Sequence, residues 1–293
     1  MQKIHTQKHY HHNRRQLKPE STRLLGVAVA GLISGALLIS LYLRAPLFCG
    51  GAPADPRAEE NGTAAAAQSA AQVEAIVHYA TSRIVPQQSH AEIGVSVGVL
   101  NSLGGSANLL VFGLGHDSLM WAAINPRGKT LFLEEDPKWV QTVLKHAPGL
   151  RADTVRYRTR LSEADELLRR HYGGEPDCAA AKSFLRGNDK CRLALNMLPE
   201  EVYATEWDMI MVDAPRGYFP EAPGRMAAIY SAAVMGRNRR RSGATHVFVH
   251  DVDRRVERMY AEAFLCKKNL VTAVGRLWHF QIPAAADLGG GFC

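Results

Sequence analysis

The chain has 293 residues, of which 46% are hydrophobic, so it is long enough to bury one sizeable core. Its formal net charge is +7, but of its 35 basic and 28 acidic residues, seven basic and one acidic lie within residues 1–44. The 28 basic and 27 acidic residues of the remainder nearly balance, which argues against a nucleic-acid partner.

The first element along the chain is a run of twenty uncharged, mostly apolar residues, Leu24–Leu43. About 20 residues of helix cross a bilayer core, and the run is longer than the apolar region of a cleaved signal peptide. Six basic residues precede it and one follows directly, so the positive-inside rule predicts a cytosolic tail over 1–23 and a lumenal body. A buried core helix is the alternative, but the basic flanks disfavour it. We predict a single-pass type II membrane anchor over 24–43.

A change of composition follows the predicted anchor. Residues 44–70 are rich in Ala, Gly, Pro and Glu and lack hydrophobic periodicity, which predicts a flexible stem. Asn61-Gly62-Thr63 within it is an N-glycosylation sequon. Further on, Cys178 and Cys191 bracket a polar stretch, and a secretory compartment permits a disulfide between them. Two separate free thiols are the alternative.

Helical and strand patterns alternate through the predicted folded domain, residues 71–283, ahead of a C-terminal tail at 284–293. After helical patterns at 71–83 and 89–100, the sequence predicts strands at 108–114, 130–133, 154–157, 207–212 and 246–250, helices at 118–124, 137–146, 162–172, 225–238 and 252–264, and a hairpin of strands 270–274 and 277–282. This alternation indicates an α/β fold, a parallel sheet with helices on both faces. A closing antiparallel hairpin on such a Rossmann-like sheet is typical of class I S-adenosylmethionine-dependent methyltransferases.

The first predicted strand ends in the loop Gly113-Leu114-Gly115-His116-Asp117-Ser118, which we predict to bind a cofactor. Ligands of open parallel sheets bind at the carboxyl ends of strands, and glycines let the backbone approach them closely. About 20 residues on, the next strand ends in Glu134-Glu135-Asp136, where an acid can accept hydrogen bonds from ribose hydroxyls. Glu134 lies nearest the strand end and is the predicted ribose ligand. Asp136 is predicted to cap the following helix.

The fourth and fifth predicted strands end in Asp213 and in His250-Asp251. A carboxylate and an imidazole at one sheet edge can take a proton from a hydroxyl, and they can also hold a divalent ion. Helix capping by Asp251 and a purely structural His250 are the alternative. We predict Asp213, His250 and Asp251 as catalytic residues and as a candidate metal site, with Asp213 as the leading base or metal ligand and the other two assisting. Asp213 is also predicted to contact the cofactor.

The loop after Asp213 is too long and too rich in Pro, Gly and aromatic residues for a simple connector. Guanidinium groups bind carboxylates through paired hydrogen bonds, and aromatic rings stack on sugar faces. Arg216, Tyr218 and Arg225 are therefore predicted to bind an anionic sugar. The alternative is that Arg225 begins a helix and pairs with Glu221.

Taken together, several stretches resemble the plant glucuronoxylan 4-O-methyltransferases, namely LVFGLGHDSLMW, TLFLEED, WDMIMVDAPRGY, EAPGRMAAIY, THVFVHDV and RLWHFQIP. The resemblance runs from about residue 89 to 283, in a family that also includes arabinogalactan methyltransferases and xylan-deposition proteins. It implies S-adenosylmethionine as methyl donor, the 4-hydroxyl of glucuronic acid on xylan as acceptor, and a Golgi membrane location. It also implies cofactor contacts at Gly113–Ser118 and Glu134, and it suits a divalent metal at Asp213, His250 and Asp251.

We therefore expect a Golgi O-methyltransferase that acts on glucuronoxylan during xylan synthesis in the secondary cell wall. The alternatives are an arabinogalactan glucuronic acid methyltransferase and a non-catalytic xylan-deposition scaffold of the same family. Two residues before the first glycine, where many methyltransferases carry an acid, this chain has Val111. Ala107 stands where family members often have Cys, which leaves the pairing of Cys266 open.

Overall fold

The computed structural model describes residues 70–182, 184–285 and 291–293. The predicted cytosolic tail, the anchor over 24–43 and the sequon at Asn61 lie outside these residues. Within the described part of the chain, no helix has both the length and the apolar character needed to cross a membrane. The membrane anchor and the domain boundaries stay predictions.

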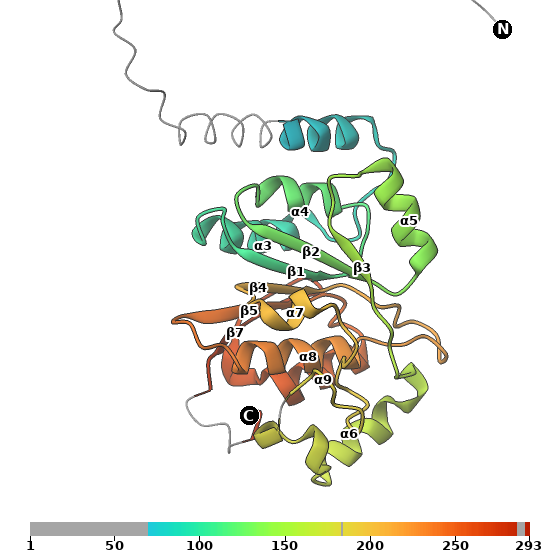
Figure 1. The fold of residues 1–293 in the computed structure, drawn as a ribbon, viewed down its shortest axis with the longest axis vertical. Helices are drawn as coiled ribbons and strands as arrows, with labels where there is room; N and C mark the ends of the chain where they lie inside the picture. Colours follow the sequence, from blue (N-terminus) through green and yellow to red (C-terminus); the bar gives the residue numbers. More distant parts are fainter. Residues whose placement is uncertain (1–69, 183, 286–290) are drawn as a thin grey trace, which may run out of the picture. The chain divides into compact units, whose positions relative to one another are not determined.

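A seven-stranded sheet in the order β3-β2-β1-β4-β5-β7-β6 forms the centre of the fold (Figure 1). The strands are β1 (Asn108–Phe112), β2 (Lys129–Glu134), β3 (Ala152–Thr154), β4 (Met209–Val212), β5 (Ala244–Val249), β6 (Leu270–Val274) and β7 (Leu277–Pro283). β1 to β5 pair in parallel, and β7 runs antiparallel to both β5 and β6. The predicted α/β sheet and its closing hairpin are thus confirmed. The chain order reverses between β1 and β4, where such sheets bind ligands.

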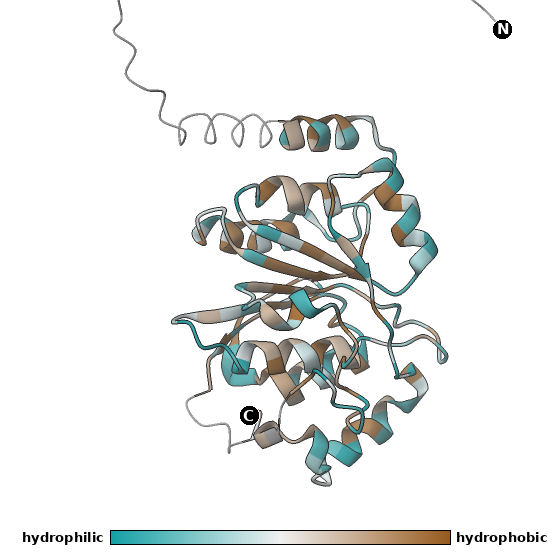
Figure 2. Cartoon of the chain, viewed as in Figure 1, coloured by the Kyte–Doolittle hydropathy of each residue, from teal (hydrophilic) through white to brown (hydrophobic). Residues whose placement is uncertain are grey.

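Helices cover both faces of the sheet (Figure 1). They are α3 (His90–Ser102), α4 (Ser118–Ile124) and α5 (Pro137–His146) on one side, and α6 (Ala164–Tyr172), α8 (Met226–Arg237) and α9 (Arg255–Tyr260) on the other, with the short α7 (Glu200–Ala204) before β4. Side chains alternate along β1, so that Leu109 and Val111 enter one hydrophobic core while Leu110 and Phe112 enter the other. Figure 2 shows the hydrophobic strands between the two helical layers.

Most elements lie within two residues of their predicted bounds, and β3 and α9 are the exceptions. β3 ends at Thr154, where the sequence predicted a strand to begin, because this edge strand has only three residues and no apolar pattern. α9 begins at Arg255 instead of residue 252, since Asp251 takes a left-handed backbone conformation with φ of 61°. A π-helical turn, Ala261–Leu265, then continues α9 to the predicted end.

Two disulfides tie down the loops and the C-terminus. Cys178 and Cys191 are bridged, as predicted, across a separation of 13 residues. Cys266 is bonded to Cys293, a pairing that the sequence had left open. Phe292, in the predicted tail, is buried against the rings of Phe264 and Tyr230, with centroids 5.2 and 5.5 Å away. The end of the chain is therefore packed into the core.

Candidate active site

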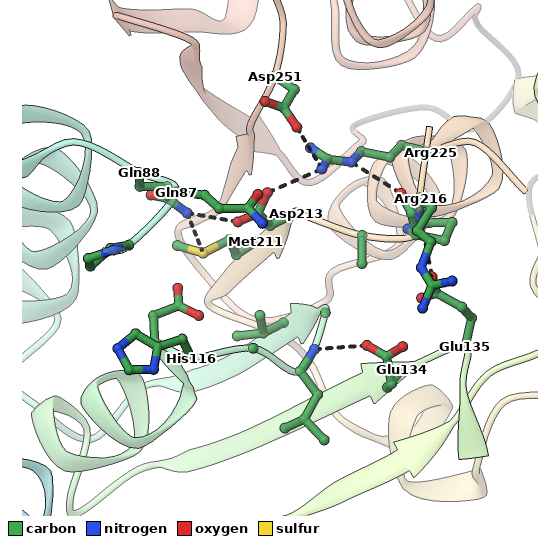
Figure 3. Close-up of a pocket in the computed structure, with 18 of the residues that line it drawn as sticks. Gln87, Gln88, His116, Glu134, Glu135, Met211, Asp213, Arg216, Arg225 and Asp251 are labelled. Atoms are coloured by element: carbon green, nitrogen blue, oxygen red, sulfur yellow. Dashed lines mark hydrogen bonds and ion pairs between the residues drawn. The ribbon is translucent and has the colours of Figure 1, made fainter. Parts of the chain in front are cut away.

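A cavity of about 550 Å³ opens at the carboxyl ends of β1, β2 and β4 (Figure 3). Small-molecule sites typically have about 300–1,000 Å³, so the space suits a cofactor. The structure brings most of the predicted site residues together in its wall: Gly113, Leu114, Gly115, His116, Asp117, Glu134, Asp213, Arg216, Tyr218, Arg225 and Asp251. The two others, Ser118 and His250, are fully buried outside that lining.

The glycine loop gives the cavity a wall of backbone. Gly113 has a φ of 126°, and a Cβ added to it would lie 3.2 Å from the Cβ of Ala214 on the neighbouring strand end. A larger residue there would strain the fold as well as fill the cavity. Ser118 supports the loop from behind, because its hydroxyl accepts a hydrogen bond of 3.0 Å from the backbone N–H of Gly115. Ser118 thus shapes the loop and does not reach the cavity.

Asp117 faces the cavity but already holds a protein partner. Its carboxylate accepts a hydrogen bond of 2.6 Å from the indole N–H of Trp121. Burial raises the pKa of Asp117. The residue is therefore fixed in place by α4, with one carboxylate oxygen left for a ligand.

A helix over 70–81, which precedes the sheet, also contacts the glycine loop. The sequence predicted no functional role for this helix. The hydroxyl of Tyr79 donates to the carbonyl oxygen of His116 at 2.7 Å and accepts from the backbone N–H of Met120 at 3.2 Å. The His116 ring lies 3.2 Å from the hydroxyl of Ser82 and 3.4 Å from the ring of His78. Burial raises the pKa of Tyr79 to about 12, so its hydroxyl stays a donor.

Glu134 lies at the end of β2, between the glycine loop and α5. One carboxylate oxygen accepts from the backbone N–H of Leu114 and the other from that of Asp136, each at 3.1 Å. A carboxylate has about four acceptor positions, so two remain for a ligand. Burial and the neighbouring Glu135 raise the pKa of Glu134 to about 7. Asp136 caps α5 through Lys138 N–H, as predicted.

Asp213 presents a charged carboxylate to the cavity. It is bonded to the ring of His250 at 2.9 Å and to the side-chain amide of Gln88 at 3.2 Å, and the guanidinium of Arg225 is also 3.2 Å away. Burial alone would raise the pKa of Asp213, but the hydrogen bond with His250 and the charge of Arg225 bring it below its ordinary value. Gln88 carries no signal in the sequence, since the pair Gln87-Gln88 ahead of α3 belongs to no recognisable motif.

His250 lies behind Asp213 and does not face the cavity. Its side chain is fully buried, and among the described residues its Nε2 atom has no hydrogen-bond partner, with the Glu92 carboxylate 3.8 Å away. This geometry suits His250 to position Asp213, which agrees with an assisting role.

Asp251 is surrounded by arginines. Its carboxylate lies 2.6 Å from Arg276, 2.8 Å from Arg225 and 3.0 Å from Arg254, and its side chain is only 1% exposed. These three cations hold its oxygens as an ionic hub at the end of β5. The carboxylate of Asp251 is thus committed to arginines, and its predicted assisting role in catalysis stays a prediction.

The predicted metal set does come together, because ligand atoms of Asp213, His250 and Asp251 lie within 4.8 Å of one another. However, Figure 3 shows Arg225 between the two carboxylates, and its Nη2 atom is 3.2 and 2.8 Å from them. A divalent ion would have to displace this buried guanidinium or share its space. The donor set therefore does not fit a divalent metal.

The predicted sugar-binding residues separate into two groups. Arg225 is 4% exposed at the start of α8, and it also donates to the carbonyl oxygen of His250 at 2.7 Å. Its charged partners are thus Asp213 and Asp251 and not the alternative Glu221, so its guanidinium is committed to these two carboxylates. Arg216 and Tyr218 remain accessible at the rim, with Arg216 Nε 3.7 Å from Glu135.

Comparison with known proteins gives a consistent set of relatives. The IRX15/IRX15L/GXM family matches residues 91–280. Arabinogalactan O-methyltransferase 1 of Arabidopsis thaliana is 61% identical over 270 residues, which cover 90% of this chain and 91% of that protein. Arabinogalactan O-methyltransferase 2 of the same plant is 56% identical over 281 residues, with 92% and 94% covered. Glucuronoxylan 4-O-methyltransferase 1, also of Arabidopsis thaliana, is 48% identical over 217 residues, with 73% and 74% covered.

Proposed function

The chain belongs to the IRX15/IRX15L/GXM family, and from this premise we propose that it transfers a methyl group from S-adenosylmethionine to glucuronic acid on arabinogalactan. The choice of acceptor rests on one observation. The chain is 61% identical to an arabinogalactan O-methyltransferase over nine-tenths of its length, and 48% identical to a glucuronoxylan 4-O-methyltransferase. This favours the alternative over the glucuronoxylan acceptor that we first expected. Glucuronoxylan is the second candidate.

The cavity residues fit the proposed cofactor. The backbone at Gly113 forms a cradle that a side chain would fill, and Glu134 keeps two acceptor positions for ribose hydroxyls. When bound, S-adenosylmethionine would supply a methyl group that its sulfonium has already activated. The chain must then align the acceptor hydroxyl and take up its proton.

We propose that the carboxylate of Asp213 accepts the proton of the acceptor hydroxyl. The acceptor oxygen becomes strongly acidic as its bond to the methyl carbon forms, so even a carboxylate with a low pKa can accept the proton. His250 and Gln88 each hold one oxygen of Asp213, which fixes the carboxylate toward the cavity. The hydrogen bond from His250 and the charge of Arg225 keep Asp213 ionised, so it remains a ready base without a metal ion.

Labelled S-adenosylmethionine, offered with purified arabinogalactan or glucuronoxylan, tests the proposal directly. We expect label to enter arabinogalactan with the higher kcat/KM. A higher value for glucuronoxylan would reverse the choice of acceptor. Absence of label from both glycans would instead favour the non-catalytic xylan-deposition scaffold.

We also propose that the enzyme acts in the Golgi lumen, anchored through Leu24–Leu43. The apolar run with its basic N-terminal side supports this orientation, and so do two disulfides in the domain. Protease digestion of intact microsomes provides the check. A domain degraded without detergent would place it on the cytosolic side.

A further inference from the structure

A second cavity, of about 350 Å³, adjoins the first. Tyr218 and Arg254 line both cavities, so the two spaces meet at these side chains. The rest of the second cavity is formed by Leu161, by Gly217, and by the first turn of α9, which includes Glu257. No residue of α9 was among the predicted site residues.

An anchored loop carries Tyr218. The backbone N–H of Leu161 donates to the carbonyl oxygen of Ala222 at 2.8 Å, and that of Ser162 donates to the carbonyl oxygen of Pro220 at 3.0 Å. These two hydrogen bonds hold the loop against the segment before α6. The Tyr218 ring is nevertheless 68% exposed. An accessible aromatic ring on an anchored loop offers an apolar face on which a sugar can stack.

Arg254 has the accessibility that Arg225 lacks. Its side chain is 32% exposed, with Nη2 3.0 Å from Asp251 and Nη1 3.7 Å from Glu257. A guanidinium has five N–H donors, and only the contact with Asp251 is short enough for a hydrogen bond. Asp251 therefore holds Arg254 in place while donors remain for an anion.

Glu257 is the other unusual group. Its side chain is 1% exposed, and among the described residues neither carboxyl oxygen has a hydrogen-bond partner. A Cβ on Gly217 would lie 2.6 Å from Glu257 Oε1, so a glycine is needed to admit the carboxyl group beneath the loop. Burial raises the pKa of Glu257, which favours a form able to donate as well as accept. The carboxyl group is thus closed off beneath Gly217, next to Arg254, and forms the floor of the second cavity.

We propose that the second cavity is the subsite for the uronate of the acceptor glycan. Arg254 pairs with the sugar carboxylate, the ring of Tyr218 covers the sugar face, and Glu257 closes the floor beneath them. The identity of the glycan rests on the function proposed above, whereas the recognition of a sugar carboxylate rests on the cavity. This assignment replaces Arg225 by Arg254 as the reader of the carboxylate.

Binding measured without turnover tests the subsite. Calorimetry with S-adenosylhomocysteine present compares a glucuronic acid-bearing oligosaccharide with its carboxyl-reduced counterpart. For the wild-type protein we expect the uronate to bind about 10- to 100-fold more tightly, the range for a charge-assisted pair. Arg254→Gln should lose this preference and Arg254→Lys should restore part of it. The distant surface variant Arg170→Gln should retain it.

The remaining outcomes separate the subsite from the reaction. Affinity for S-adenosylhomocysteine within about threefold of wild type shows that a variant has kept its fold, and Arg254→Lys decides if Arg254→Gln does not fold. Wild-type preference in Arg254→Gln, or loss of preference in Arg170→Gln, overturns the subsite. Where Arg254→Gln does not fold, wild-type preference in Arg254→Lys overturns it. A wild-type protein that methylates a glycan but binds both oligosaccharides equally also overturns it and leaves the proposed function standing. Preference that depends on Arg254 without any methylation supports the subsite and refutes the reaction.

Discussion

Replacing Asp251 with asparagine should destabilise the protein by removing the centre of its buried ionic hub. Asparagine keeps the shape of the side chain and tolerates the left-handed backbone that Asp251 adopts at φ of 61°. The change therefore removes the charge and leaves the backbone preference. Arg225, only 4% exposed, would lose its 2.8 Å partner.

The size of the loss follows from the exposure of the three arginines. Arg254 and Arg276 are 32% and 41% exposed, and ion pairs with such access to solvent contribute only about 0–1 kcal/mol each. Removing one partner of a buried pair costs about 3–5 kcal/mol. Arg225 would still have Asp213 at 3.2 Å, so we expect the lower end, about 3 kcal/mol. For a domain of this size, that lowers Tm by about 6–12 °C.

Denaturant and thermal unfolding of Asp251→Asn measure this loss, with the exposed neighbour Asp253→Asn as the matched control at under about 0.5 kcal/mol. A double-mutant cycle with Arg225→Met isolates the pair, and we expect a coupling of about 2 kcal/mol or more. A cost below about 1 kcal/mol together with additive double mutants would refute the ionic hub.

Three further predictions concern the cavity. Asp213→Asn should lower kcat about 100-fold or more while the Kd of the cofactor changes little, and an unchanged kcat would exclude Asp213 as the proton acceptor. The pKa of Glu134 is raised from 4.5 to about 7, so its contribution to stability is complete below pH 4.5 and is lost as pH rises through 7. Cofactor affinity should rise through that same pH range because the carboxylate accepts ribose hydroxyls, and titrations of Glu134→Gln should show neither pH dependence. Tyr79→Phe removes the donor to His116 and the acceptor for Met120, so calorimetry should show about 5- to 10-fold weaker cofactor binding, and wild-type affinity would mean that the loop holds its shape alone.

The sheet could largely be predicted because its central strands carry a strong local signal. β4, for example, is buried at all four positions and appears in the sequence as a continuous apolar run. β3 has three half-buried or exposed residues at the sheet edge, so its position depends on pairing with β2 and not on its own pattern. The delayed start of α9 likewise follows from the backbone of Asp251, which no local preference reveals.

Parts of the candidate site were predictable for the same reason. The glycine loop and the acids after β2 and β4 follow strand ends, and strand ends could be located. The partners of these groups could not, because they come from distant segments. Arg225 follows a loop whose composition is typical of a sugar-binding site. Only the fold shows that it lies between two buried carboxylates. Tyr79 belongs to an ordinary helical pattern, yet it fixes the loop 37 residues later.

Phe292 and Cys293 complete one side of the core, which bears on when this domain can finish folding. Until both have been synthesised, the rings of Tyr230 and Phe264 lack a neighbour and Cys266 lacks its bonding partner. β5 has a similar dependence, because it needs β7, some 30 residues later, to cover its far edge. By contrast, the bond between Cys178 and Cys191 can close while the chain is still growing. We therefore expect the half of the domain around α8 to be completed only once residues 292 and 293 are in place and thiols can be oxidised.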